Sequence, residues 1–424
     1  MPYFLNITEL QKPRNSARFC LFCHYLSYIL CLALIIFSQF LHAGDSFKNL
    51  KNQQINEILF NIDSYYVEDL ALHKHFPKTA NSKQIENLFK QLDPYSKYLD
   101  EDELEAIFSS TNGRYTGLGI EVKTIDGRII IANTLHNSPA QLAGLKANDE
   151  VTAVNSHSVV GKSINHVAKL IRNSPSKVVQ LSISRATNET LEFGIKREQI
   201  NLESVTSYLD ESGIALVTIN VFNNHTLHDL AKQIVKMQMH NDHPLSGLVI
   251  DLRDNPGGTL QSAVEISDLF LDSGTIVTTK GRFVDANHHY SAKYGDIIGG
   301  APIVVLLNHN SASAAEILAA ALRDNQRATL IGAQSYGKGS VQSLIPLGNG
   351  NTALKLTTAK YYTPAGESIE GRGIRPDMLI NQSMLSEINQ DVIIKNIQQL
   401  DLFSSLFDQQ YKEHLKTEHL ITMQ

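Results

Sequence analysis

A run of small polar residues between an apolar strand and a helix, residues 308–313, is the first candidate for chemistry. It reads Asn-His-Asn-Ser-Ala-Ser and follows an apolar run that ends at Leu307. A hydroxyl here lies at a helix N-terminus, where backbone N–H groups and the helix dipole favour negative charge. That environment suits a serine that loses its proton and carries an acyl group. Ser311 and Ser313 also fit as helix caps, and the turn taken alone favours capping.

Lys338 is the candidate base for such a serine. It lies between Gly337 and Gly339, whose backbone freedom permits other segments to approach closely. Burial lowers a lysine pKa from about 10.4 toward neutrality, so that the neutral amine can accept a proton. Gln342 could orient this amine without adding charge, whereas a carboxylate there would raise the lysine pKa.

Histidine is the alternative base. The chain has 16 histidines, but the sequence ties none of them to the serine turn, and His309 is too near in the chain to be assigned. A Ser/His/Asp arrangement therefore stays open, without support from the sequence.

Residues 332–338 also match the beginning of a phosphate-binding loop, Gly-x-x-x-x-Gly-Lys. Such a loop continues with Ser or Thr to hold magnesium, and Gly339 stands there instead. A helix should follow, yet residues 340–345 alternate like a strand. The sequence therefore argues against a nucleotide site.

A glycine pair after another buried strand could supply an oxyanion hole. Residues 251–258 read Asp-Leu-Arg-Asp-Asn-Pro-Gly-Gly and precede a predicted helix. The two glycines leave backbone N–H groups free to point at a developing oxyanion. A plain strand-to-helix turn explains the pattern equally well.

Taken together, these motifs resemble the carboxyl-terminal processing peptidases, also called tail-specific proteases, over about residues 46–400. The matching segments follow the family's order and are residues 65–67, 92–94, 252–258, 311–316, 336–342, 361–366 and 368–377. The resemblance implies a Ser/Lys serine endopeptidase with a PDZ domain, acting by acyl transfer without metal or cofactor. It assigns Ser313 as nucleophile, Lys338 as base and Gln342 as third catalytic member. The other implied site residues are the oxyanion group Gly257, Gly258 and Ala314, and the supporting residues Ser311 and Glu316.

A second set of short motifs resembles a PDZ domain. Residues 116–120 are similar to the loop with which such domains capture a C-terminal carboxylate, and the peptide then adds as a strand. The expected tail-binding residues are Gly117, Leu118, Gly119 and Ile120. Residues 138–145 and Asp149 strengthen the resemblance, while Asn148 and Asn173 depart from it where the family usually has glycine. Arg172 is interpreted as a solvated arginine at a helix end rather than a sensor of the bound tail.

The elements that must position these residues fall into five segments. Apolar residues recur at helical spacing in 44–100, short strands dominate 101–197, and strands alternate with helices in 198–385. The expected fold is an α/β protease core, a mixed sheet with flanking helices, in 198–385. An inserted PDZ domain of short strands and helices occupies 101–197, and helical segments lie at 44–100 and 386–424.

The first 43 residues read as a secretory signal. Basic residues precede an apolar run, and Ala43 ends the segment. An uncleaved membrane anchor is the alternative, although polar residues interrupt the run. We therefore expect export to the periplasm or the extracytoplasmic face of the membrane. The three cysteines, Cys20, Cys23 and Cys31, all lie here, so the exported part has no disulfide, thiolate metal site or cysteine nucleophile.

Bulk composition bounds the remaining function classes. The chain has 424 residues, 42% of them hydrophobic and 19% charged, which is an ordinary globular composition. A net charge of -6 without a basic stripe argues against nucleic acid as a partner.

The predicted partners are protein or peptide substrates with free C-termini, and the family resemblance allows an adaptor protein and a homodimer. The alternatives are a PDZ peptide-binding protein with an inactive protease core and a hydrolase that uses histidine.

Overall fold

The computed structural model describes residues 50–72, 80–135, 137–185, 189–241, 244–293, 295–348, 350–380 and 390–399. The predicted signal segment, residues 1–43, lies outside them, as does most of the predicted C-terminal helical segment. Among the described residues, no helix has the length and apolar character needed to cross a bilayer.

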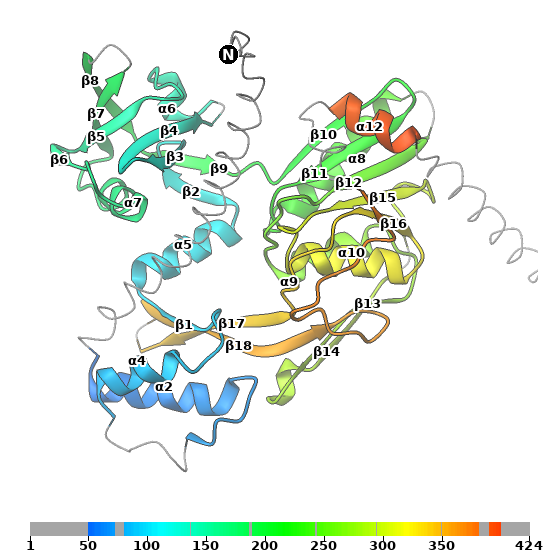
Figure 1. The fold of residues 1–424 in the computed structure, drawn as a ribbon, viewed down its shortest axis with the longest axis horizontal. Helices are drawn as coiled ribbons and strands as arrows, with labels where there is room; N and C mark the ends of the chain where they lie inside the picture. Colours follow the sequence, from blue (N-terminus) through cyan, green and yellow to red (C-terminus); the bar gives the residue numbers. More distant parts are fainter. Residues whose placement is uncertain are drawn as a thin grey trace, which may run out of the picture.

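A six-stranded mixed sheet forms the centre of the α/β core (Figure 1). Its order is β10 (Val205–Leu209), β11 (Ile214–Ile219), β12 (Gly247–Asp251), β15 (Ile303–Leu307), β16 (Ala328–Gly332) and β19 (Met378–Leu379). Only β10 runs antiparallel to its neighbour. Every residue of β12 and β15 is buried, as expected for parallel strands covered on both faces.

Helices cover the two faces of this sheet unequally. One face packs against α8 (Thr226–His240), α9 (Leu260–Asp268) and α10 (Ala314–Asp324). The opposite face packs against α12 (Gln390–Gln399). The predicted strands and helices between residues 214 and 323 are confirmed to within a few residues, because each has a strong apolar period of its own.

A second, five-stranded sheet lies beside the core sheet (Figure 1). It contains β1 (Lys97–Leu99), β13 (Thr275–Gly281), β14 (His288–Ser291), β17 (Ser340–Leu347) and β18 (Thr352–Tyr362). The N-terminal helices α2 (Asn52–Tyr65) and α4 (Ser82–Phe89) pack their apolar stripes on β17 and β18. Strand β17 occupies the stretch in which a phosphate-binding loop would have a helix, so the strand prediction there is confirmed.

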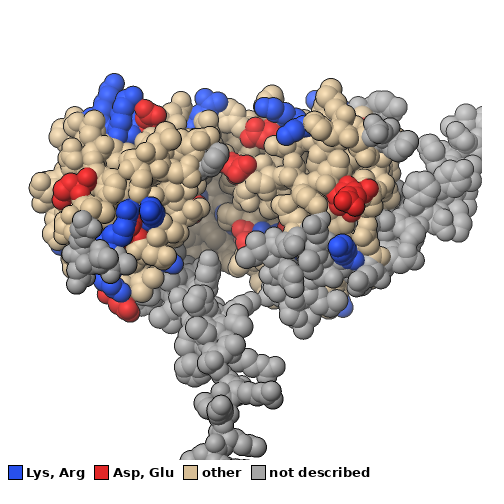
Figure 2. Space-filling model, turned by 90° about the horizontal axis from the view of Figure 1, so that it is seen from above, with Lys and Arg blue, Asp and Glu red and all other residues tan. Residues whose placement is uncertain are grey.

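The PDZ unit has its own sheet and its own core. The strands are β3 (Ile120–Ile125), β4 (Arg128–Thr134), β5 (Glu150–Val154), β6 (His157–Ser158), β7 (Val178–Arg185) and β8 (Glu189–Lys196), with helices α6 (Pro139–Leu142) and α7 (Ile164–Arg172). The two-stranded ribbon of β2 (Arg114–Gly117) and β9 (Glu198–Asn201) leads back to the core (Figure 1). Seen from above, the molecule is hollowed between two lobes, and acidic and basic side chains are interspersed on that face (Figure 2).

Helix α5 (Glu101–Thr111) touches both the PDZ unit and the second sheet. Its Leu104 is buried with Leu99 and Ala353 of that sheet. On the PDZ side, Lys169 Nζ forms an ion pair with the Asp102 carboxylate at 2.8 Å, and Arg172 Nη1 donates to the Asp102 carbonyl at 3.1 Å. The interpretation of Arg172 as a solvated side chain is therefore wrong, because α5 supplies an acceptor that the sequence places 70 residues away.

Candidate active site

Ser313 lies at the N-terminus of α10, where the chain leaves β15. Its backbone adopts φ 57° and ψ −113°, a conformation that a residue with a side chain rarely takes and that clusters at functional sites. Ser311 holds the preceding turn in place with two hydrogen bonds. Its buried Oγ donates to the Leu252 carbonyl at 2.8 Å and accepts from Asn308 N–H at 2.9 Å. The turn therefore presents Ser313 on a rigid base.

The glycine pair at residues 257–258 packs directly against this turn. A Cβ on Gly257 would lie 2.8 Å from Ser313 Cβ and 3.0 Å from Ala314 N, at φ 98°. A Cβ on Gly258 would lie 1.9 Å from the Phe222 carbonyl oxygen. Both positions therefore need glycine, and the predicted oxyanion group is brought together in space.

The three predicted oxyanion residues differ in what their N–H groups bind. The N–H of Gly257 donates to Asn255 Oδ1 at 2.7 Å. Within the described part of the chain, the N–H groups of Gly258 and Ala314 make no hydrogen bond. These two donors remain free to bind an anionic oxygen beside Ser313.

A buried carboxylate, Glu316, joins two segments: the serine turn, residues 308–313, and the lysine loop, residues 333–339. Its Oε2 accepts the N–H groups of Ser313 at 2.7 Å and Lys338 at 2.9 Å. Its Oε1 accepts Ser335 Oγ at 2.5 Å and Gly337 N–H at 2.7 Å. Burial raises the pKa of Glu316, while these four donors oppose that rise. The main chains of the two predicted catalytic residues thus meet at one oxygen atom.

Lys338 is half-buried, and its amine faces an aromatic ring. Burial lowers the pKa of Lys338, and the carboxylates of Glu370, Glu316 and Asp93 oppose the change. Its Nζ lies 4.9 Å from the centre of the Tyr95 ring. Among the described residues, no hydrogen bond joins Lys338 Nζ to Ser313.

The side-chain amide of Gln342 is held by two neighbouring hydroxyl groups. Its Nε2 donates to Ser340 Oγ at 3.0 Å and to Thr357 Oγ1 at 3.2 Å. The structure thus brings the backbones of Ser313 and Lys338 together without direct hydrogen bonds among the three predicted catalytic side chains. Catalytic contacts are often long in unliganded structures and tighten when substrate binds.

The predicted tail-binding loop, residues 117–120, connects β2 to β3. Gly119 has φ 77°, and its carbonyl accepts Leu135 N–H at 2.9 Å. In the described chain the N–H groups of Leu118 and Gly119 make no hydrogen bond, so they are available to a carboxylate. Leu118 itself is buried in the PDZ core.

Asn148 and Asn173 stand where the PDZ pattern usually has glycine, and both adopt backbone conformations that asparagine tolerates. Asn148 adopts φ 70°, the left-handed conformation that asparagine tolerates better than most residues. Asn173 has φ −87° at the end of α7, where no glycine is needed.

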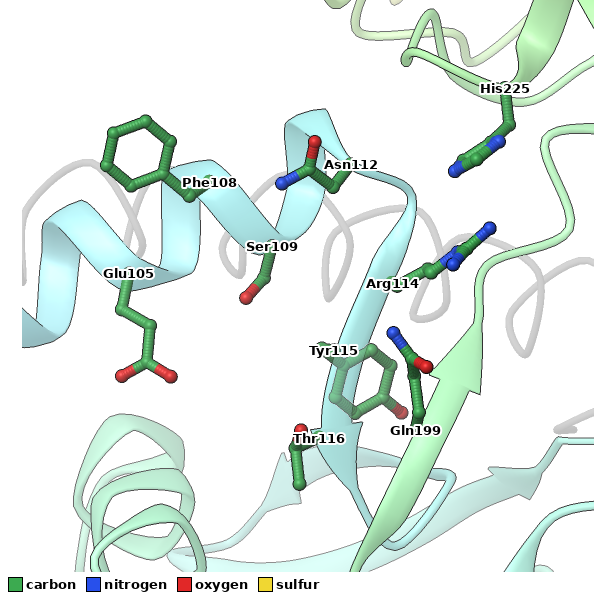
Figure 3. Close-up of a pocket in the computed structure, with 9 residues that line it drawn as sticks. All are labelled: Glu105, Phe108, Ser109, Asn112, Arg114, Tyr115, Thr116, Gln199 and His225. Atoms are coloured by element: carbon green, nitrogen blue, oxygen red, sulfur yellow. The ribbon is translucent and has the colours of Figure 1, made fainter.

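A pocket that the sequence did not indicate lies between α5 and the ribbon of β2 and β9, with His225 of the core at its edge. It has a volume of about 400 Å³. Figure 3 shows Arg114 of β2 and His225, next to the start of α8, pointing toward one another across its mouth. Sequence reasoning gave no role to Tyr95, whose ring lies near Lys338 Nζ, or to Tyr361, although Tyr361 begins the matching segment 361–366. In the described chain, no group of three or more His, Cys, Asp or Glu residues is arranged to hold a metal ion.

Comparison with known proteins agrees with this arrangement. The model of peptidase family S41 matches residues 213–380, and a PDZ domain model matches residues 131–185. A "Carboxy-terminal-processing protease" from Bartonella bacilliformis is 40% identical over 310 residues, which cover 72% of this chain and 71% of the relative. "Carboxy-terminal processing protease CtpB" from Bacillus subtilis is 35% identical, over 74% of this chain and 66% of the relative.

The solved structure titled "Photosystem II D1 C-terminal processing protease" has the same fold, with a TM-score of 0.52 at 24% identity, over 82% of this chain and 97% of the other. The fold and site define a serine-type peptidase with a PDZ domain. The chain belongs to peptidase family S41, among the carboxy-terminal-processing proteases.

Proposed function

We propose that the chain is an endopeptidase that captures the free C-terminus of a protein substrate with its PDZ unit and cleaves the chain through Ser313 and Lys338. The observation that carries the proposal is the sharing of Glu316 Oε2 by the backbones of these two residues, beside the free N–H groups of Gly258 and Ala314.

The reaction begins when the neutral amine of Lys338 takes the proton from Ser313 Oγ as that oxygen attacks the scissile carbonyl. The carbonyl oxygen becomes an anion bound by the N–H groups of Gly258 and Ala314. Lys338 then gives its proton to the leaving amine, and the acyl group stays on Ser313. Water, deprotonated by Lys338, releases that acyl group. For the first step Lys338 Nζ moves from the Tyr95 ring toward Ser313, and Gln342 turns to orient it.

The free N–H groups of Leu118 and Gly119 support tail capture. The substrate carboxylate binds them, and the peptide extends along β3 as an added strand. Export through the first 43 residues, an adaptor protein and a homodimer remain predictions.

A pair of matched reporters tests this proposal. One disordered polypeptide ends in a free carboxylate and the other in an amide, with Ser313→Ala as the blank. We expect the free-carboxylate form to be cleaved at least about tenfold faster, because the amide cannot take the place of a charge at the loop. Equal cleavage of both would remove the tail-capture step, and no cleavage of either would contradict the endopeptidase itself.

A further inference from the structure

The hydroxyl of Tyr361 is buried beside the active site without a hydrogen bond. The side chain is 2% exposed, and its Oη makes no hydrogen bond with the described residues. Its backbone N–H donates to the Gly339 carbonyl at 2.9 Å, which fastens the end of β18 to the lysine loop. A buried hydroxyl without a partner costs folding free energy, so an arrangement that keeps one is a candidate for function.

The surroundings of this hydroxyl are those of the nucleophile. Ser313 is a polar neighbour of the hydroxyl, and Glu316, Glu370 and Tyr95 are its ionisable neighbours. Burial raises the pKa of Tyr361 well above its ordinary value. The phenol therefore keeps its proton across the working pH range and can act as a donor but never as a base.

Ser313 is the acceptor that this donor best matches. Both oxygens of Glu316 already accept two donors each. Glu370 Oε2 accepts Gly339 N–H at 2.8 Å. In this structure the phenol makes no hydrogen bond to Ser313 or to any other described residue.

We propose that Tyr361 is a further catalytic residue, which donates a hydrogen bond from Oη to Ser313 Oγ while that oxygen attacks. The inference rests on the proposed Ser/Lys function. With one lone pair of Oγ held by Tyr361, the serine proton is directed away from the phenol and toward Lys338. The developing negative charge on Oγ is stabilised before it passes to the substrate carbonyl. Tyr361 keeps its proton throughout, and the serine proton goes to Lys338.

Tyr361→Phe tests the inference with little change in side-chain volume. We expect the rate of labelling by a fluorophosphonate, which reports the nucleophilicity of Ser313, to fall about 10- to 100-fold, as for loss of one strong hydrogen bond. We expect kcat for the free-carboxylate reporter to fall by the same factor with KM unchanged. The melting temperature should stay equal or rise, because the variant removes a buried hydroxyl that has no partner.

The matched control is Tyr362→Phe, one residue along the same strand. The Tyr362 ring is half-buried beneath Lys280 Nζ, 4.9 Å from the ring centre, away from Ser313. We expect wild-type labelling from this variant. Wild-type labelling of Tyr361→Phe would overturn the inference, and so would a fall in melting temperature that accompanies the loss of rate, since the hydroxyl would then be structural.

Ser313→Ala separates this inference from the proposal on which it rests. If that variant is still labelled and active, the Ser/Lys function itself fails. If it is inert while Tyr361→Phe reacts like the wild type, only the role of Tyr361 is wrong.

Discussion

Lys338→Met is expected to lower kcat/KM by about 10⁴-fold or more, as completely as Ser313→Ala, because each removes one half of the proposed proton-transfer pair. Methionine has a similar length and lacks the amine. The folded state should keep its stability, since Lys338 is half-buried with its pKa lowered by burial and its Nζ over the Tyr95 ring. Cleavage of the free-carboxylate reporter and thermal unfolding of the same samples measure the two effects.

The control for this variant is Lys360→Met, a half-buried lysine of β18 that we give no part in the reaction. It is expected to retain activity within about twofold, as is usual for substitutions away from a site. The double variant Ser313→Ala/Lys338→Met should be no slower than either single variant, because residues that act as a unit are not additive. Substantial activity in Lys338→Met would indicate a different base, and a histidine would then have to be sought.

Glu316→Gln is expected to lower kcat/KM by about 10²- to 10³-fold and to destabilise the fold by about 2–3 kcal/mol. Glutamine has one acceptor oxygen, and its amide N–H₂ would face two of the four donors that Glu316 accepts. The serine turn and the lysine loop would lose their common attachment. Because the Glu316 side chain is fully buried and cannot touch a bound substrate, the loss should appear in kcat more than in KM.

Glu367→Gln is the matched control, since Glu367 is exposed and its side chain makes no hydrogen bond in the described structure. It should behave as the wild type in both assays. If Glu316→Gln retained full activity with a normal melting temperature, the geometry of Ser313 and Lys338 would have to be maintained by other contacts. The backbone conformation of Ser313 at φ 57° would be the next candidate for study.

The parts of the fold that could be predicted are those with a strong local pattern. Strand β15 is a uniform apolar run, β12 is an apolar run that ends at Asp251, and α10 has an apolar period that begins right after Ser313. Contacts between residues that are far apart in the sequence leave no such local pattern. The contact of Arg172 with Asp102 crosses 70 positions, and the pattern around Arg172 described only a polar helix end.

The candidate site divides in the same way. Sequence motifs predicted Ser313, Lys338 and the glycine pair as site residues, because reactive residues and turn residues are recognisable by type. They could not show that the Gly257 N–H donates to Asn255 Oδ1, nor that Tyr361 lies beside Ser313. Those facts depend on side-chain orientation and on pairing between strands from separate parts of the chain.

The strand pairing of the second sheet bears on when the chain gains activity during its synthesis. Strand β1 pairs with β18, so Lys97 lies opposite Lys355, and that sheet carries the lysine loop. On the proposed Ser/Lys mechanism, a nascent chain that ends before Lys338 has a serine turn but no base. Pairings of such long range also form late in folding. The proposed mechanism therefore predicts that the chain gains protease activity only after β17 and β18 have been synthesised and paired.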